Sequence, residues 1–264
     1  MKVCIDCQFR KMVFCELMKK FTLIIFSISL FLCSILFNIS YEKNITLADN
    51  KPTQSQFEDS EEAFQEKKDK AHKNLNSMIG YLVTAESTVQ NFSYLSSDDK
   101  TEIISDLKAK KQYLQDKKNE TDNQGVDANG SLDSMRVFTG EVETYWDEVY
   151  IKVIFYSGKL MQAKVDYLYT NLNSTIDSLS SEIVIAQNGG KDTSQAQTSL
   201  DSAVSNLTTL ASKILQMNSE FANIQDKNMA IFHLMRGKQY VRESDSVIQD
   251  MITDLENTVY FLEN

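Results

Sequence analysis

The residues of this chain that could carry out chemistry are few and far apart. His72 and His233 are the only histidines, and neither belongs to an HExxH pattern, which would put two zinc ligands on one helix face. Acidic neighbours occur at Glu61–Glu62, at Asp98–Asp99, and at Asp245 with Asp250. All of them lie in segments with helical periodicity, where a solvated charge is the simpler interpretation. The sequence indicates no catalytic residue, and we expect a protein that is not an enzyme.

Groups that bind metals in other proteins occur at two places. Cys4 and Cys7 form one CxxC pair, which resembles half of a zinc site or a redox pair, but no second pair lies near it. Asp122, Asp127 and Asp133 surround a polar break that lacks the D-x-[DN]-x-[DN]-G pattern of a calcium-binding loop. We therefore expect neither a metal nor a cofactor.

The composition restricts the fold and the partners. The chain has 264 residues, of which 27 are Lys or Arg and 37 are Asp or Glu, so its formal net charge is −10. This acidic balance gives no electrostatic footprint for nucleic acid. A single proline, Pro52, is far below the ordinary usage of about 5%, and long uninterrupted helices become the expected fold.

The first predicted helix is an uncharged run over Phe21–Ile39, which comes directly after Lys19 and Lys20. Its 19 residues would span about 28 Å as a helix, close to the hydrocarbon thickness of a bilayer. Residues 18–39 are therefore predicted to be either a signal peptide or a transmembrane anchor. Residues 1–17 are interpreted as an upstream extension that is either untranslated or cytoplasmic.

Whether this segment is cleaved stays open at the level of the sequence. Thr46-Leu47-Ala48 offers small residues for a cleavage site near Ala48, at the cost of a long spacer. All four cysteines lie at or before Cys33, and residues 1–39 carry five basic and two acidic side chains, which leaves a net charge of −13 for residues 40–264. This pattern favours export, with the body outside the cytoplasm. Residues 40–56, which lack regular periodicity, are predicted to be a flexible tether.

The first helical hairpin is predicted over residues 57–121. Apolar residues recur at heptad spacing, at Phe64, Ala71, Met78, Ala85 and Phe92. A turn follows, and Ser97 or Asp98 is the expected N-cap of the second helix.

A second, longer hairpin is predicted over residues 131–264. Its first helix has about 55 residues with three-or-four spacing and ends at Asn188-Gly189-Gly190. A last helix follows, with a loosened stretch over residues 218–228. The expected fold class is therefore all-α, an elongated antiparallel bundle or coiled coil of two long hairpins behind an N-terminal hydrophobic helix.

The middle of the long helix is rich in aromatic residues. Tyr145, Trp146, Tyr150 and Phe155 lie within 11 positions, and several of them fall outside the main apolar seam. Core packing is the simpler interpretation, and an exposed interaction patch is the alternative. These four residues are the best candidate interaction site that the sequence offers.

Over residues 93–264 the chain resembles a group of exported helical-bundle proteins from little-studied bacteria. The resemblance rests on Leu95-Ser96, Lys100, Ile103-Ile104, Leu107, Leu114, Lys117, Arg136-Val137-Phe138 and Gly190-Lys191-Asp192. It implies a location in the cell envelope and an all-helical fold. It transfers no functional residue to this chain.

The function expected from these features is that of a structural or protein-interaction module of the cell envelope. Its protein partners are unknown, residues 21–39 would contact the membrane if they are retained, and seams of this length can close within one chain or between two copies. Two alternatives stay open: an extracytoplasmic bundle that senses a ligand, and a helical protein that inserts into membranes.

Overall fold

The structure, a computed structural model, describes residues 61–123, 133–225 and 227–263. These residues form five helices, α2 (Glu61–Asn91), α3 (Ser97–Asp122), α4 (Asp133–Asn188), α5 (Ser194–Ala222) and α6 (Lys227–Glu263). No strand occurs among them, which confirms the all-helical fold class. The helices belong to one compact unit, residues 55–264. The predicted signal or anchor, the tether, and Cys4 and Cys7 lie outside the described residues.

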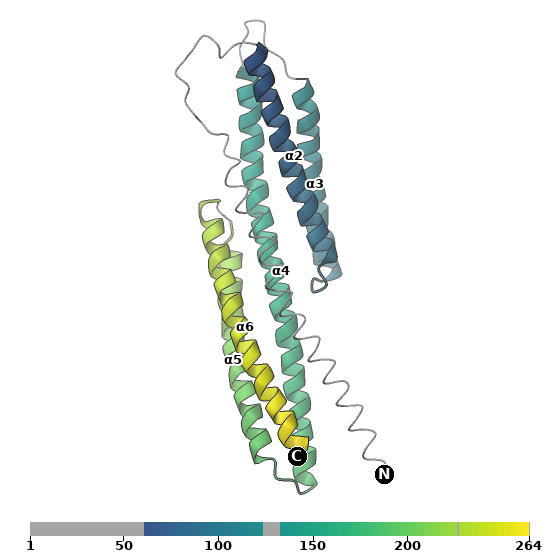
Figure 1. Cartoon of the computed structure of the whole chain (residues 1–264), viewed down its shortest axis with the longest axis vertical. Coiled ribbons are helices and arrows are strands. Elements are labelled where there is room, and N and C mark those ends of the chain that lie inside the picture. Colours follow the sequence, from purple (N-terminus) through teal and green to yellow (C-terminus); the bar gives the residue numbers. More distant parts are fainter. Residues whose placement is uncertain (1–60, 124–132, 226, 264) are drawn as a thin grey trace. The chain divides into compact units, whose positions relative to one another are not determined.

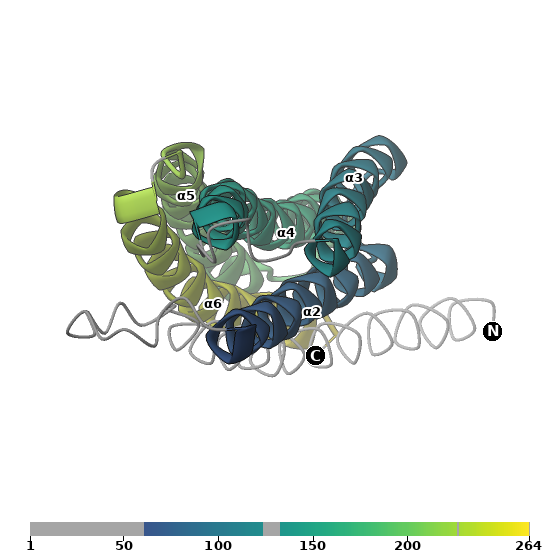
Figure 2. The same cartoon turned by 90° about the horizontal axis from the view of Figure 1, so that it is seen from above.

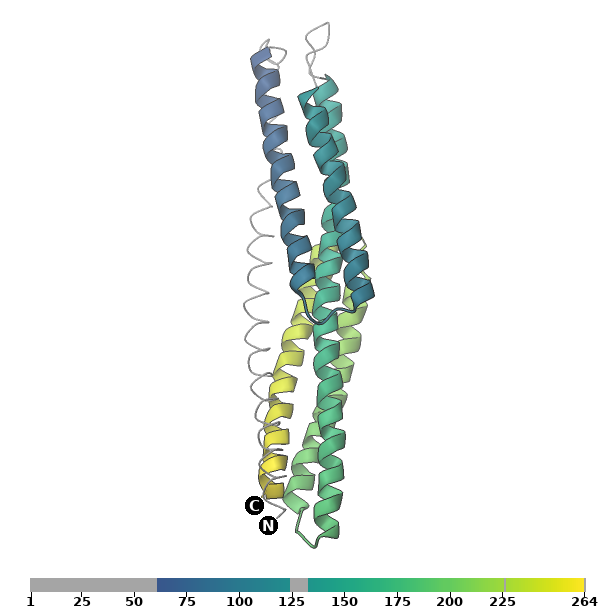
Figure 3. The ribbon, with the colours of Figure 1, turned by 90° about the vertical axis from the view of Figure 1, so that its right-hand side faces the viewer.

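Helix α4 is the common support of two helical hairpins. The α2–α3 hairpin packs along the N-terminal part of α4, and the α5–α6 hairpin packs along its C-terminal part (Figures 1 and 3). Figure 2, a view along the helices, shows α4 between the two hairpins. Because α4 has 56 residues, it is long enough for each hairpin to have a stretch of its own.

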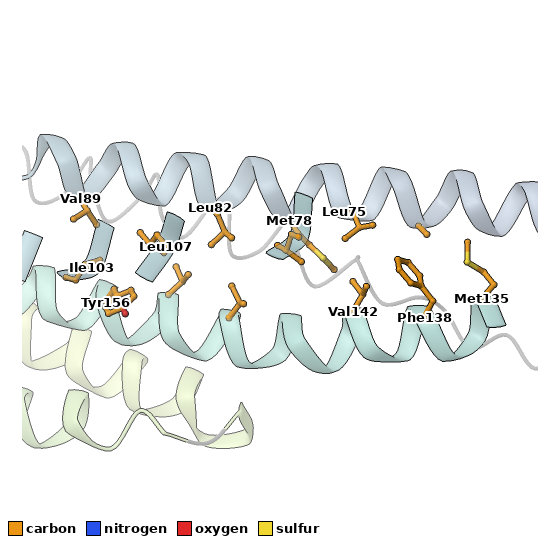
Figure 4. Close-up of a cluster of buried hydrophobic side chains, with 14 of the residues drawn as sticks. Leu75, Met78, Leu82, Val89, Ile103, Leu107, Met135, Phe138, Val142 and Tyr156 are labelled. Atoms are coloured by element: carbon orange, nitrogen blue, oxygen red, sulfur yellow. The ribbon is translucent and has the colours of Figure 1, made fainter. Parts of the chain in front are cut away.

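The core between α2, α3 and α4 follows the heptad seam (Figure 4). Phe64, Ala71 and Met78 are buried on α2, together with the interleaved Leu75 and Leu82. Leucine and isoleucine side chains of α3 close one side of this core, and methionine, valine and aromatic side chains from the first half of α4 close another. The heptad spacing thus identified the buried face of α2 correctly.

The N-cap of α3 differs from the expectation. Ser96, not Ser97 or Asp98, caps the helix: its Oγ accepts the backbone N–H of Asp99 at 3.0 Å. Ser96 has the extended backbone of an N-cap, with φ −60° and ψ 156°, so its hydroxyl can reach back to the first turn. Asp98 and Asp99 then lie in that turn, where carboxylates complement the helix dipole.

The turn between α4 and α5 ends the long helix where the glycines predicted it. Gly190 has a φ of +81°, a left-handed conformation that glycine adopts without steric cost. Backbone bonds from Gly190 to Gln187 (2.9 Å) and from Lys191 to Ala186 (3.1 Å) satisfy the last carbonyls of α4.

The single last helix that the sequence suggested is two helices. α5 ends at Ala222 and α6 begins at Lys227, inside the stretch that was expected to be loosened. The backbone N–H of Asn223 bonds the carbonyls of Glu220 and Phe221, and Ile224 is buried directly after the turn. This buried turn lets α6 fold back along α5 as an antiparallel partner.

Contacts at three levels fix the register of α5 and α6. Lys213 pairs with Glu243 at 2.6 Å, and Glu220 pairs with Arg236 at 3.1 Å. Farther along, Asp254 accepts hydrogen bonds from Ser202 (2.8 Å) and Asn206 (3.0 Å). In this antiparallel register, Asn218 lies opposite Lys238.

Candidate functional site

The structure places two of the candidate patch residues, Tyr145 and Trp146, against the first hairpin. The ring of Tyr145 lies on that of Tyr113 from α3, with centroids 3.8 Å apart. The edge of Trp146 meets Tyr81 from α2 at 5.8 Å and 75°. Both residues are half-buried and border the α2–α3–α4 core, so each has one side in protein contact.

The other two residues of the patch, Tyr150 and Phe155, are also half-buried. The ring of Phe155 has Lys152 and Lys159 on it, at 5.3 Å and 5.6 Å from its centroid. Such cation–π pairs cover an aromatic ring with charge and reduce its apolar exposure. Phe155 also packs against the α2–α3–α4 core, as Tyr145 and Trp146 do, and the role of the four residues as an interaction patch stays a prediction.

We expect Trp146→Ala to lower the free energy of unfolding by about 2 kcal/mol, because the variant loses the half-buried contact with Tyr81 and leaves a partial cavity. Urea unfolding followed by circular dichroism measures this loss. The matched control is Leu215→Ala on the exposed surface of α5, for which a change within about 0.5 kcal/mol is expected. Equal effects of the two substitutions would contradict a packing role for Trp146.

A part-buried hydrogen bond joins α3 to the centre of α4. The hydroxyl of Tyr156 donates to Asp106 at 2.6 Å, and Lys110 pairs with the other oxygen of that carboxylate at 3.0 Å. Burial, followed by this contact with Asp106, raises the pKa of Tyr156. The group therefore stays a neutral donor and positions α3 on α4.

The core of the α4–α5–α6 half contains a ring held between two glycines. An added Cβ at Gly237 would lie 2.1 Å from the Phe221 ring, and one at Gly158 would lie 2.9 Å from it. Phe221 itself is buried. The three helices can approach this closely only because α4 and α6 carry no side chain at these positions.

The helices α5 and α6 also contain buried polar atoms without partners. Lys238 Nζ, Asn218 Oδ1, Ser244 Oγ and one oxygen of Asp245 are buried and make no hydrogen bond in the described part of the chain. Lys238 is only 4% exposed. Buried polar groups are normally paired, so these four atoms, which we call the polar seam, are the most unusual chemistry of the described residues.

Burial lowers the pKa of two lysines in this region. The pKa of Lys238 falls to about 8 through burial and then through the charge of Arg242. The pKa of Lys164 on α4 also falls to about 8 through burial, which the charge of Asp245 partly offsets. The carboxyl of Asp245 responds in the opposite sense, because burial raises its pKa.

These shifts predict a stability that rises in mild alkali. An unfolded lysine has a pKa of about 10.4, so between pH 8 and 10 the unfolded chain binds more protons than the folded chain. The free energy of unfolding should rise by about 3 kcal/mol from pH 7.5 to 9.5 and should fall above about pH 10, where unfolded tyrosines ionise first. Urea unfolding across this range measures the effect. A flat or falling profile below pH 9.5 would contradict the burial of Lys238 and Lys164.

The remaining residues singled out in the sequence lie in separate pairs. His72 lies 3.0 Å from Asp122, and His233 lies 2.8 Å from Glu220. Within the described ranges no group of three His, Cys, Asp or Glu side chains could hold a metal ion. Asp127 lies outside those ranges.

Sequence reasoning missed the polar seam, although a signal was present. The apolar spacing of the last helix runs from Leu234 to Val241 and leaves the intervening turn at Gly237-Lys238. A lysine at a position of the apolar spacing, next to a glycine, indicates an unusual core contact. Because Lys238 is charged, the sequence analysis treated it as a surface residue.

The comparisons with known proteins returned no match. Neither a family model, nor a curated protein, nor a solved structure is similar to this chain at a significant level. Among the helices described, none is both long and apolar enough to cross a bilayer.

Proposed function

We propose that the chain is a structural and protein-interaction module of the cell envelope, with no catalytic role. The observation that carries this proposal is the use of one 56-residue helix, α4, as the support of two separate hairpins. Each hairpin buries its own seam on α4, and in the described part of the chain the outer side of each hairpin is open to partners. Such a frame suits a spacer or a scaffold.

The envelope part of the proposal rests on the sequence. The run Phe21–Ile39 after two lysines, the acidic body, and the cysteines confined to residues 4–33 favour export. The resemblance over residues 93–264 to exported helical bundles supports the same location. The finer architecture, with an N-terminal hydrophobic helix ahead of two long hairpins, belongs to this proposal.

The full gene expressed in a bacterial host tests the location. Membrane and soluble fractions are separated, and the intact mass of the mature protein is measured. A soluble species that begins near Asp49 supports a secreted module, and a membrane-bound species that keeps residues 21–39 supports an anchored one. An uncleaved species in the cytoplasmic fraction would contradict export.

A second candidate function, a ligand-sensing bundle, is favoured by the polar seam. Unpaired polar atoms in a helical core lower the free energy needed to change its packing, because the closed state does not satisfy them. A polar solute that pairs with Lys238 would stabilise one arrangement of α5 and α6. Thermal-shift measurements with small carboxylates and phosphate, on wild type and Lys238→Met, test this. Shifts that are equal in the two proteins would exclude the seam as the sensing site.

A further inference from the structure

The two hairpins overlap along the middle of α4. The turn between α2 and α3, residues 92–96, reaches along α4 as far as Tyr167, since the rings of Tyr94 and Tyr167 lie 4.9 Å apart. The α5–α6 hairpin reaches in the other direction as far as Asp147, which pairs with Lys227 of α6. Residues 147–167 of α4 therefore lie beside both hairpins (Figures 1 and 3). A side chain from this stretch can interact with both of them.

Lys164 is such a side chain, and the first hairpin supplies one side of its surroundings. The lysine is 8% exposed, and its Nζ lies 5.5 Å from the centroid of the Tyr94 ring. Tyr94 is half-buried and also packs edge-on against Phe92, with centroids 5.4 Å apart. An ammonium group over an aromatic face is attracted by the ring, and this attraction is stronger where water is excluded. The contact therefore helps to hold the α2–α3 turn on α4.

Asp245 of α6 supplies an opposite charge from the second hairpin. Burial lowers the pKa of Lys164 to about 8, and the charge of Asp245 partly offsets this shift. Burial raises the pKa of Asp245, and the charge of Lys164 opposes that shift in turn. Oδ1 of Asp245 is buried without a hydrogen bond, so the carboxylate gains from a nearby cation. Lys164 thus interacts with a ring of the first hairpin and with a carboxylate of the second.

We propose that Lys164 couples the two hairpins, so that displacement of the α2–α3 turn from α4 loosens α6. When the ring of Tyr94 leaves, the buried ammonium group loses a contact that compensates for its desolvation, and it moves toward water. Asp245 then stays buried with a weaker counter-charge, and local opening of α6 becomes easier.

The coupling acts in both directions, because energetic coupling between two sites is reciprocal. A change at Asp245 is therefore felt at the α2–α3 turn. This inference goes beyond the proposed function: two hairpins with separate seams would respond to partners independently, whereas coupled hairpins transmit the binding of a partner from one to the other.

Hydrogen exchange of the full-length chain, followed by mass spectrometry, tests the coupling. Tyr94→Leu removes the ring, and the matched control Tyr94→Phe keeps it. Tyr94→Leu should raise the exchange rate of the amides of residues 237–248 in α6 about tenfold, and Tyr94→Phe should change it less than about twofold. In a Lys164→Met background, Tyr94→Leu should have no further effect on α6, because the coupling group is gone. Circular dichroism verifies that each variant is folded.

Two further variants complete the test. Tyr81→Leu disturbs the first hairpin at its contact with Trp146, so it should raise exchange in α2 and leave residues 237–248 unchanged. Asp245→Asn removes the charge on α6 and should raise exchange at residues 89–100, around the α2–α3 turn, about threefold. If Tyr94→Leu does not fold, Asp245→Asn decides the question alone.

Four results would overturn the proposal. They are unchanged exchange in α6 with Tyr94→Leu, a rise that persists in the Lys164→Met background, an equal rise in α6 with Tyr81→Leu, and unchanged exchange at the α2–α3 turn with Asp245→Asn.

Discussion

Replacing Lys238 by methionine should raise the free energy of unfolding by about 3 kcal/mol near pH 7, because it removes a charge that the folded chain buries without a partner. Lys238 is 4% exposed, and its Nζ has no hydrogen-bond partner in the described residues. Methionine keeps the apolar stem and a similar length, so the packing around Phe221 is retained. Urea unfolding at pH 7 measures the gain.

The matched control for this substitution is Lys213→Met on α5. Lys213 is half-buried and pairs with Glu243 at 2.6 Å, so its replacement should cost up to about 1 kcal/mol instead of adding stability. Lys238→Met should also reduce the stability rise between pH 7.5 and 9.5 to about half, leaving the part that belongs to Lys164. A loss of stability in Lys238→Met would mean that the ammonium makes an interaction that outweighs its desolvation.

The all-helical fold could be predicted because its signals are local. A chain with one proline has almost no obligatory helix breaker, and the spacing of Phe64, Ala71 and Met78 defines the buried face of α2 without knowledge of its partners. Gly190 likewise marks the end of α4 by its own backbone preference. Each of these features depends only on residues within a few turns.

Features that depend on pairs of distant helices could not be predicted in the same way. The sequence shows that Tyr145 and Trp146 lie beside the seam of the long helix, but not that Tyr113 and Tyr81 would cover them. The sequence predicted only a weaker apolar periodicity around Ala222 and not the end of a helix. The turn that follows Ala222 contains neither proline nor glycine, which are the residues that usually indicate a turn. Helix pairing is set by tertiary contacts, and periodicity along one helix contains no information on which neighbour fills each side.

The contact between Gly237 of α6 and Phe221 of α5 leads to the second prediction with a large effect on the free energy of unfolding. Gly237→Ala should lower the free energy of unfolding by about 2–3 kcal/mol, because the new methyl group would overlap the ring of Phe221. The ring cannot move away, since Gly158 of α4 lies against its other part. Phe221→Ala should cost about 3–5 kcal/mol through the cavity that it leaves.

The double variant shows whether these two losses have one cause. With Phe221 reduced to alanine, the methyl group of Gly237→Ala enters the vacated space, and its higher helix propensity should then return about 1 kcal/mol. The sign of the glycine substitution therefore reverses between the two backgrounds, which a double-mutant cycle in urea measures directly. Gly80→Ala and Gly140→Ala are the controls: nothing lies within 4 Å of an added Cβ at either site, so each should gain about 0.5–1 kcal/mol. Additive losses in the cycle would show that Gly237 is required for a reason other than the close approach of Phe221.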